Sequence, residues 1–195
     1  MNLPCVESAE QNKRAIYAAI NSHLHGDALE IGSGTGQHAV FFAGLSPGVS
    51  WQTSDLETSL PGIAARIRAC GLDNLPAPIL LDVLGEWPGR QYDFVFTANS
   101  FHIMTLEMVA ACIAGAGASL KKGGIFAVYG PFNYRGAFTS DSNASFDRML
   151  RMRDPASGIK DFEWIAERAG EAGLELIDDV EMPENNRTLL WQKRT

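Results

Sequence analysis

The sequence predicts an α/β fold built on one doubly wound, seven-stranded and mostly parallel sheet. Short apolar runs alternate with segments of helical periodicity, which is typical of a parallel sheet with helices on both faces. The last two expected strands, at 174–180 and 188–192, leave no room for a helix between them, so they should pair antiparallel. The length of 195 residues, with 46% hydrophobic and 20% charged residues, fits a single domain spanning 1–195.

The first half of the chain supplies three of these strands. A helix is expected over 8–25, where Ser8 can cap the N-terminus and Gln11 stands at the capping-box position. The elements that follow are a strand at 28–31, a helix at 37–45, a strand at 49–53, a helix at 57–70 and a strand at 78–82. Gly71 comes directly after the helix at 57–70 and fits a left-handed C-terminal cap.

The second half contains the remaining strands and a long insertion. Its elements are a strand at 92–98, a helix at 105–120, a strand at 123–129, a helix at 162–172 and the two final strands. The stretch 131–161 shows no clear element, and loops of this length in a compact domain are usually functional or disordered. Its four aromatic residues favour an ordered cap; they are Phe132, Tyr134, Phe138 and Phe146.

Composition excludes several classes of protein. The net charge of −7 and the pI of about 5.1 argue against a large phosphate-binding surface, so nucleic acid is an unlikely partner. The cysteines at 5, 70 and 112 have no metal-ligand spacing, so we expect reduced thiols and no metal. The first residues show no basic-then-apolar pattern of a signal peptide, and no apolar stretch is long enough for a bilayer, so we expect a soluble, cytoplasmic protein that does not bind membranes. The oligomeric state stays open.

The central motif is a glycine loop at 32–36, between the strand at 28–31 and the helix at 37–45. Glycines at such a junction allow a sharp turn and let a ligand approach the backbone closely. A dinucleotide fingerprint needs a glycine where Gln37 stands, and no Lys-Ser or Lys-Thr pair follows, as a nucleotide-triphosphate loop requires. A cofactor without a pyrophosphate is therefore favoured. S-adenosyl-L-methionine, which leaves S-adenosyl-L-homocysteine as its product, is such a cofactor.

Acidic residues stand at the ends of the first three strands. Glu30 suits the cationic amino-acid end of this cofactor, and backbone amides at the following helix start suit its carboxylate. Asp55, about twenty residues past the loop, is placed to accept hydrogen bonds from ribose hydroxyls, and Asp82 to receive the adenine amino group. Singly, each acid could equally be a capping or surface carboxylate. The predicted cofactor-binding residues are Glu30, Gly32, Ser33, Gly34, Thr35, Gly36, Asp55, Leu56, Asp82, Val83 and Asn99.

Seven segments carry a resemblance to known proteins. They are E-I-G-S-G-T-G-Q-H at 30–38, W-Q-T-S-D at 51–55, Y-G-P-F at 129–132, T-S-x-S-N at 139–143, F-D at 146–147, R-D-P at 153–155 and M-P-x-N-N at 182–186. On these segments the chain resembles the class I S-adenosylmethionine-dependent methyltransferases, and more specifically the family labelled domain of unknown function 938. The resemblance covers nearly the whole chain and implies a Rossmann-like methyltransferase fold and this cofactor, but no substrate.

Methyl transfer is an in-line displacement, for which the enzyme mainly aligns a nucleophile and excludes water. The end of the strand at 92–98 lies nearest the methyl group in this topology. Asn99 is a candidate to orient the nucleophile, and His102 a candidate general base because its ordinary pKa is close to neutral. His102 could equally be a packing or capping histidine. Tyr129, after the fifth strand, is the third catalytic candidate.

Polar and aromatic residues around this edge are candidates for substrate binding. They are Asn12, Lys13, Phe132, Asn133, Ser140, Asn143 and Arg153. The alternative is that these side chains bond to one another and order the long insertion. An aromatic and amide lining favours a small planar or polar substrate.

Several functions fit these observations. The first is a methyltransferase acting on a small molecule. One alternative is a methyltransferase that acts on a protein or on RNA, and a rim of exposed apolar residues around the cleft would favour a protein substrate. Another is a non-catalytic S-adenosylmethionine-binding protein. A dehydrogenase is more distant because of Gln37.

Overall fold

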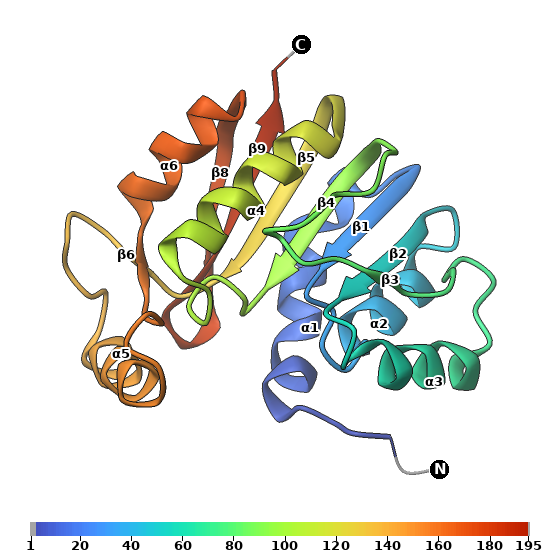
Figure 1. Cartoon of the computed structure of the whole chain (residues 1–195), viewed down its shortest axis with the longest axis horizontal. Coiled ribbons are helices and arrows are strands. Elements are labelled where there is room, and N and C mark those ends of the chain that lie inside the picture. The colour runs from blue at the N-terminus through green and yellow to red at the C-terminus, as the bar shows by residue number, and fades with distance from the viewer. Residues whose placement is uncertain (1–2, 195) are drawn as a thin grey trace.

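The computed structural model describes residues 3–194 and contains a seven-stranded sheet in the order β3-β2-β1-β4-β5-β9-β8 (Figure 1). Strand β9 pairs antiparallel with β5 and with β8, whereas β1 to β5 pair in parallel. The predicted fold class and the antiparallel last strand are therefore confirmed. The strands are β1 (Asp27–Ile31), β2 (Ser50–Asp55), β3 (Ile79–Leu80), β4 (Tyr92–Ala98), β5 (Leu120–Gly130), β8 (Leu174–Met182) and β9 (Asn186–Lys193).

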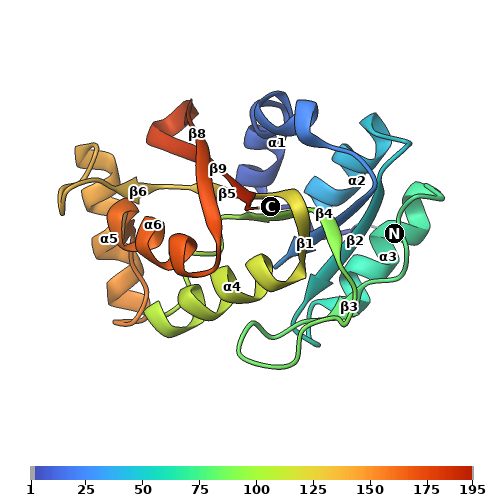
Figure 2. The same ribbon diagram turned by 90° about the horizontal axis from the view of Figure 1, so that it is seen from above.

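Helices cover both faces of the sheet. Figure 2 shows α1 and α2 on one side, and α4 and α6 on the other. The helices are α1 (Glu7–Ile20), α2 (Gln37–Leu45), α3 (Leu60–Cys70), α4 (Leu106–Ser119), α5 (Asp141–Arg153) and α6 (Phe162–Glu171), with short 3₁₀ turns η1 (Asn21–His23) and η2 (Pro183–Asn185). Strands β6 (Phe132–Asn133) and β7 (Lys160–Asp161) form a separate two-stranded sheet. Within residues 3–194, none of the helices combines the length and apolar character that a membrane crossing requires.

The central strands have apolar residues on both faces, which explains why they read as continuous apolar runs. In β4, Phe94 and Phe96 pack with α1 and α2, whereas Val95 packs in the cluster that contains α4 and α6. In β5, Ala127 and Val128 divide between the two clusters in the same way. Because successive side chains of a strand point to opposite faces, each strand serves both layers of helices.

Helix α1 differs from its prediction at both ends. It ends at Ile20 rather than at residue 25, and the chain continues as η1. Its N-cap is Val6, which makes no side-chain cap, so Ser8 lies inside the helix and Gln11 has no capping partner there. The backbone N–H of Val6 donates to Gln37 Oε1 at 2.7 Å. This contact with α2 fixes the entry of the chain into α1, where the sequence suggested a local cap.

The region between β2 and β4 is less regular than predicted. Helix α3 begins at Leu60 rather than at residue 57, with Pro61 in its first turn, where a missing N–H costs nothing. The predicted left-handed cap at Gly71 is confirmed by its φ of 65°. Strand β3 has only two residues, so Asp82 and Val83 lie in the turn that follows the strand.

The insertion at 131–161 contains helix α5, which the sequence analysis did not predict. Ser140 caps this helix by accepting a hydrogen bond from the backbone N–H of Asn143 at 3.1 Å. Its buried face includes Asn143, Asp147 and Leu150, so two of these three residues are polar. Asp147 Oδ1 accepts a hydrogen bond from the backbone N–H of Ile159 at 2.8 Å, which closes the insertion on itself. Within the insertion, α5, β6 and β7 thus form hydrogen-bonded structure, where the sequence indicated no clear element.

Candidate active site

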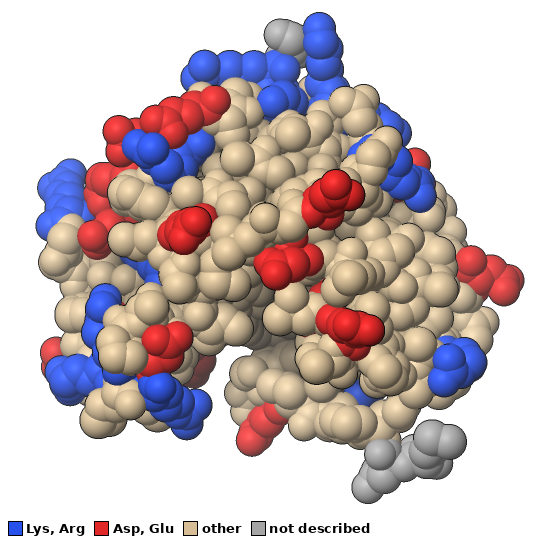
Figure 3. Space-filling view, in the orientation of Figure 1, with Lys and Arg blue, Asp and Glu red and all other residues tan. Residues whose placement is uncertain are grey.

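A cavity of about 410 Å³ opens at the carboxyl ends of the parallel strands. These ends point to the lower edge of Figure 1, and Figure 3 shows the molecule deeply hollowed at the same edge. Ligands of open α/β sheets bind at such an edge. The residues that line the cavity are Ile31, Gly32, Gly34, Asp55, Leu56, Ser59, Leu81, Asp82, Val83, Ala98, Asn99, Ser100, Ile103, Met104 and Met108.

The glycine loop forms one wall of this cavity. Gly32 and Gly34 line it with φ of 67° and 56°, a left-handed conformation that residues with a Cβ rarely adopt. A Cβ on Gly32 would lie 3.1 Å from Ser100 Oγ, whereas a Cβ on Gly34 would meet open space. Backbone conformation is thus the requirement at Gly34, and no side chain of Gly32 or Gly34 stands between the loop backbone and a ligand in the cavity.

Two acidic side chains line the same cavity as the glycine loop. Asp55 accepts hydrogen bonds from the backbone N–H groups of Gly34 and Leu56, each at 2.7 Å. Asp82 Oδ1 accepts from the backbone N–H of Leu84 at 3.0 Å, and the Asp82 side chain is exposed. The cavity lining contains neither lysine nor arginine. Its electrostatic character is therefore acidic, which favours cationic or hydrogen-bond-donating ligands and disfavours phosphates.

Four predicted cofactor residues, namely Glu30 behind the loop and Ser33, Thr35 and Gly36 within it, do not line the cavity. Glu30 is 2% exposed, and its Oε2 accepts a hydrogen bond from Trp51 Nε1 at 3.2 Å. Burial raises the pKa of Glu30 to about 7, so a carboxylate at this position is sensitive to a nearby positive charge. Ser33 is buried against the end of β2, Thr35 bonds to the first side chain of α2, and Gly36 is the left-handed N-cap of α2.

The end of β4 brings Asn99 to the cavity, as predicted. Asn99 has a φ of 58°, and its backbone N–H donates to the carbonyl of Tyr129 at 2.9 Å. Asparagine tolerates this left-handed conformation better than most residues, and such strained positions concentrate at functional sites. Helix α4 and the turn before it add Ile103, Met104 and Met108 to the lining, a contribution that was not predicted from the sequence. Their adjacency to Asn99 was the available signal.

His102 lies under the cap, next to the cavity but not in its lining. It is 8% exposed, and its ring meets the ring of Phe146 edge-on with centroids 5.1 Å apart. Burial lowers the pKa of His102 to about 4, and the ammonium group of Lys160 acts in the same direction. The imidazole is therefore neutral at pH 7 and has a nitrogen lone pair with which to accept a proton.

Tyr129 lies on the face of the sheet that α1 and α2 cover, and the two predicted residues Asn12 and Lys13 belong to α1. Burial raises the pKa of Tyr129, and the side chains of Asn12 and Asn186 lie beside its hydroxyl. Asn12 Oδ1 also contacts His38 Nε2 at 2.7 Å. Lys13 pairs with a glutamate of its own helix and lies over an aromatic ring of α2. The structure thus brings Asn12 to Tyr129, whereas Lys13 is engaged with neighbouring side chains.

The predicted substrate residues of the cap have structural contacts. Phe132 is 1% exposed and belongs to the hydrophobic core, and Asn133 lies in β6 paired with β7. Asn143 Nδ2 donates to Thr139 Oγ1 and to the backbone carbonyl of Asn185, and Ser140 is the cap of α5. Arg153 is exposed in the last turn of α5. Phe132, Asn133, Ser140 and Asn143 thus have structural contacts in the cap, and neither these four residues nor Arg153 lines the cavity.

Comparison with solved structures defines the class of the fold. This chain aligns with the S-adenosylmethionine-dependent methyltransferase SibL in its apo form at 18% identity and a TM-score of 0.82, over 96% of this chain and 56% of that chain. It aligns with an O-methyltransferase family protein from Burkholderia thailandensis at 17% identity and a TM-score of 0.80, over 96% of this chain and 58% of that chain. It aligns with human N-acetylserotonin methyltransferase in complex with SAM at 15% identity and a TM-score of 0.82, over 97% of this chain and 53% of that chain. The chain thus has a Rossmann-like methyltransferase fold and spans a little over half the length of these proteins.

The chain belongs to the family described as "Protein of unknown function (DUF938)", whose model matches residues 4–193. The predicted family and fold are therefore confirmed.

Proposed function

We propose that this protein transfers the methyl group of S-adenosyl-L-methionine to a small molecule. The observation that carries the proposal is the cavity at the strand ends. It combines the glycines Gly32 and Gly34 with Asp55 and Asp82, and among residues 3–194 no basic side chain lines it. A sulfonium nucleoside carries positive charge and hydroxyl and amino donors, whereas a dinucleotide or nucleotide triphosphate carries phosphates that this lining would repel.

The residues of this chain suit the separate parts of the cofactor. Asp55 is held by two backbone N–H groups and faces the cavity, where it can accept hydrogen bonds from ribose hydroxyls. Val83 and Met108 offer apolar surface for the adenine ring, with Asp82 beside them for its amino group. Glu30 lies behind the loop, where a nearby ammonium group would stabilise its ionised form.

When bound, the cofactor supplies a methyl group made electrophilic by the positively charged sulfur. Transfer would form a bond between the acceptor and the methyl carbon and break the sulfur–carbon bond, and an acceptor that carries a proton would have to lose it to a group of this chain or to water. Asn99 would orient the acceptor at the end of β4, and the neutral imidazole of His102, next to the cavity, would take the proton. Because burial lowers the pKa of His102 to about 4, it is a weaker base than an ordinary histidine, whose near-neutral pKa made it a candidate in the sequence. Tyr129 keeps its phenolic proton because its pKa is raised, so it can donate a hydrogen bond.

Two measurements test the proposal. Isothermal titration calorimetry of the purified protein should show binding of S-adenosyl-L-methionine and S-adenosyl-L-homocysteine, but not of NADH or ATP. Isotope-labelled cofactor should then transfer its methyl group to the dialysable fraction of a metabolite extract. A protein that binds neither the cofactor nor its product is not a methyltransferase of this kind. Binding without transfer to any pool would leave a non-catalytic cofactor-binding protein.

A methyltransferase that acts on a protein is the second candidate, and one observation favours it. Leu56 and Ile103 line the cavity with exposed fractions of 50% and 59%, so its mouth has an apolar rim. Label transferred to the macromolecular fraction in place of the dialysable fraction would support this second candidate.

A further inference from the structure

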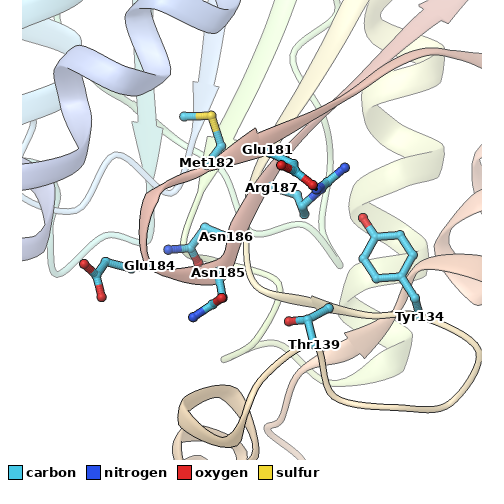
Figure 4. A pocket seen from close by; sticks show the side chains of 8 residues that line it. All are labelled: Tyr134, Thr139, Glu181, Met182, Glu184, Asn185, Asn186 and Arg187. Carbon is cyan, nitrogen blue, oxygen red and sulfur yellow. The ribbon is translucent and has the colours of Figure 1, made fainter.

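A second and larger cavity, of about 740 Å³, lies between the β8–β9 hairpin and the cap (Figure 4). Its lining comes from the hairpin tip and from the segment that follows β6. The residues are Tyr134, Thr139, Glu181, Met182, Glu184, Asn185, Asn186 and Arg187. The volume lies within the range typical of small-molecule sites.

The hairpin tip links this cavity to the cofactor cavity. Asn186 lies beside the hydroxyl of Tyr129, and the carbonyl of Tyr129 accepts the backbone N–H of Asn99 at 2.9 Å. Asn99 lines the cofactor cavity. The end of β5 lies between the strand that leads to Asn99 and the hairpin tip, because Ala98 pairs with Tyr129 and Gly130 pairs with Arg187, which lines the hairpin cavity.

The geometry of the tip is fixed by the cap. Glu184 and Asn185 both have left-handed backbone, with φ of 58° and 57°. The Asn185 carbonyl accepts a hydrogen bond from Asn143 Nδ2 at 3.2 Å, and Asn185 Nδ2 donates to Ser142 Oγ at 3.3 Å. Figure 4 shows the Glu184 and Asn186 side chains extending to the same side of the hairpin, away from Tyr134, and both residues act on the pKa of the Tyr129 hydroxyl, so this is the side that faces the end of β5. Contacts with α5 thus hold this hairpin tip in place.

Within the described part of the chain, some of the charged side chains that line the cavity form ion pairs, and one does not. Arg187 Nε bonds to Asp179 Oδ1 at 2.8 Å, and Arg187 Nη1 pairs with Glu181 Oε1 at 3.0 Å. Tyr134 donates its hydroxyl proton to Asp179 at 2.8 Å. Among residues 3–194, the carboxylate of Glu184 has neither an ion pair nor a hydrogen bond. The one basic group of the lining is therefore neutralised, and a free carboxylate remains.

We propose that this hairpin cavity holds the methyl acceptor, and that the acceptor is a small molecule with a positively charged amine recognised by Glu184. The inference rests on the proposed function. The amide groups of Asn185 and Asn186 supply further hydrogen bonds to a polar acceptor, and their neutrality leaves the charge preference to Glu184. A carboxylate or phosphate on the acceptor would meet a like charge with no free cation to offset it.

The test uses the full chain, isotope-labelled S-adenosyl-L-methionine and a dialysable bacterial metabolite extract. Ion exchange at neutral pH divides the extract into cationic, neutral and anionic fractions, and label should transfer mainly to the cationic one. Glu184→Gln should lower transfer at limiting acceptor by roughly tenfold, the loss expected for one hydrogen bond to a charged group. Its cofactor affinity should stay unchanged. Glu184→Lys should shift the preference towards the anionic fraction.

Glu175→Gln is the matched control, because Glu175 is an exposed acid at the opposite end of β8. Transfer mainly to the anionic or neutral fraction would overturn the inference, as would equal losses in the Glu184 and Glu175 variants. Cofactor binding without transfer of label to any fraction would also overturn the inference, but it would leave the proposed cofactor site standing. Failure to bind the cofactor would instead refute the proposed function.

Discussion

Replacing Asp55 with alanine should weaken S-adenosyl-L-methionine binding by roughly tenfold to a hundredfold. The two 2.7 Å hydrogen bonds from Gly34 and Leu56 fix the carboxylate at the cavity edge, so it is ordered before a ligand arrives. A hydrogen bond to a charged group contributes about 1.5–3 kcal/mol, and about 1.4 kcal/mol corresponds to a tenfold change in affinity. The predicted loss is therefore that of one ribose contact.

Stability should change little in the same variant. The backbone N–H groups of Gly34 and Leu56, which donate hydrogen bonds to Asp55, lie at exposed positions, so water can replace the carboxylate as their partner. Calorimetric titration and thermal unfolding would be measured together, with Asp73→Ala as a control because Asp73 is exposed and outside the cavity lining. The reasoning fails if the affinity of the Asp55 variant matches that of the control. It also fails if affinity falls only because the protein unfolds.

Three further predictions concern titratable side chains. His102→Ala should lower the turnover number strongly and leave cofactor affinity nearly unchanged, and a parallel loss of both in kinetics and calorimetry would contradict the base role. Burial lowers the pKa of both His38 and His102 to about 4 in the folded protein, so between pH 4.5 and pH 6.5 these two residues bind protons only in the unfolded chain. Burial raises the pKa of Glu30 to about 7, so over the same range this residue keeps a proton only in the folded protein. Their sum is one proton more in the unfolded state, so the free energy of unfolding should rise by about 1.4 kcal/mol per pH unit. Urea denaturation would measure this slope, and replacing both histidines with glutamine should reverse its sign. Slightly below pH 7, cofactor binding should release a proton from Glu30, whose pKa of about 7 falls beside a cation. Calorimetry in buffers of different ionisation enthalpy would detect the release, and Glu30→Gln should abolish it.

The sheet could be predicted from the sequence because its signals are local. Buried strands such as β4 read as apolar runs, and the positions at which they end are marked by glycine or polar residues. The antiparallel pairing of β8 and β9 followed from the short connection alone. Both inferences use only neighbouring residues, so no knowledge of the tertiary structure was required.

Helix α5 could not be predicted in this way because its buried face is largely polar. Asn143 and Asp147 occupy inward positions where an amphipathic helix usually has apolar residues, so the apolar periodicity is missing. Their hydrogen-bond partners, Asn185 and Ile159, lie far along the chain or beyond the helix. A buried polar group is tolerated only where a partner is present, and that partner is visible only in the folded protein.

The candidate cavity shows the same division. Gly34, Asp55 and Asn99 stand at strand ends, which the sequence locates directly, and the structure places all three in the cavity lining. Met104 and Met108 also line it, but they belong to an apolar stretch at the start of α4 whose exposed and buried faces the sequence does not distinguish. Glu30 satisfied the same sequence criterion as Asp55, yet it lies behind the loop.

Gln37 has a larger role than the sequence indicated. In the sequence it only excludes a dinucleotide site, because a glycine is absent at that position. In the structure it is 4% exposed, and its Oε1 accepts hydrogen bonds from Val6 N and Thr35 Oγ1, each at 2.7 Å. Its Nε2 donates to Glu10 Oε1 at 2.7 Å. One side chain thus ties the glycine loop to α1, the helix that carries Asn12 to Tyr129, so a glycine here would remove a contact on which the geometry of the site depends.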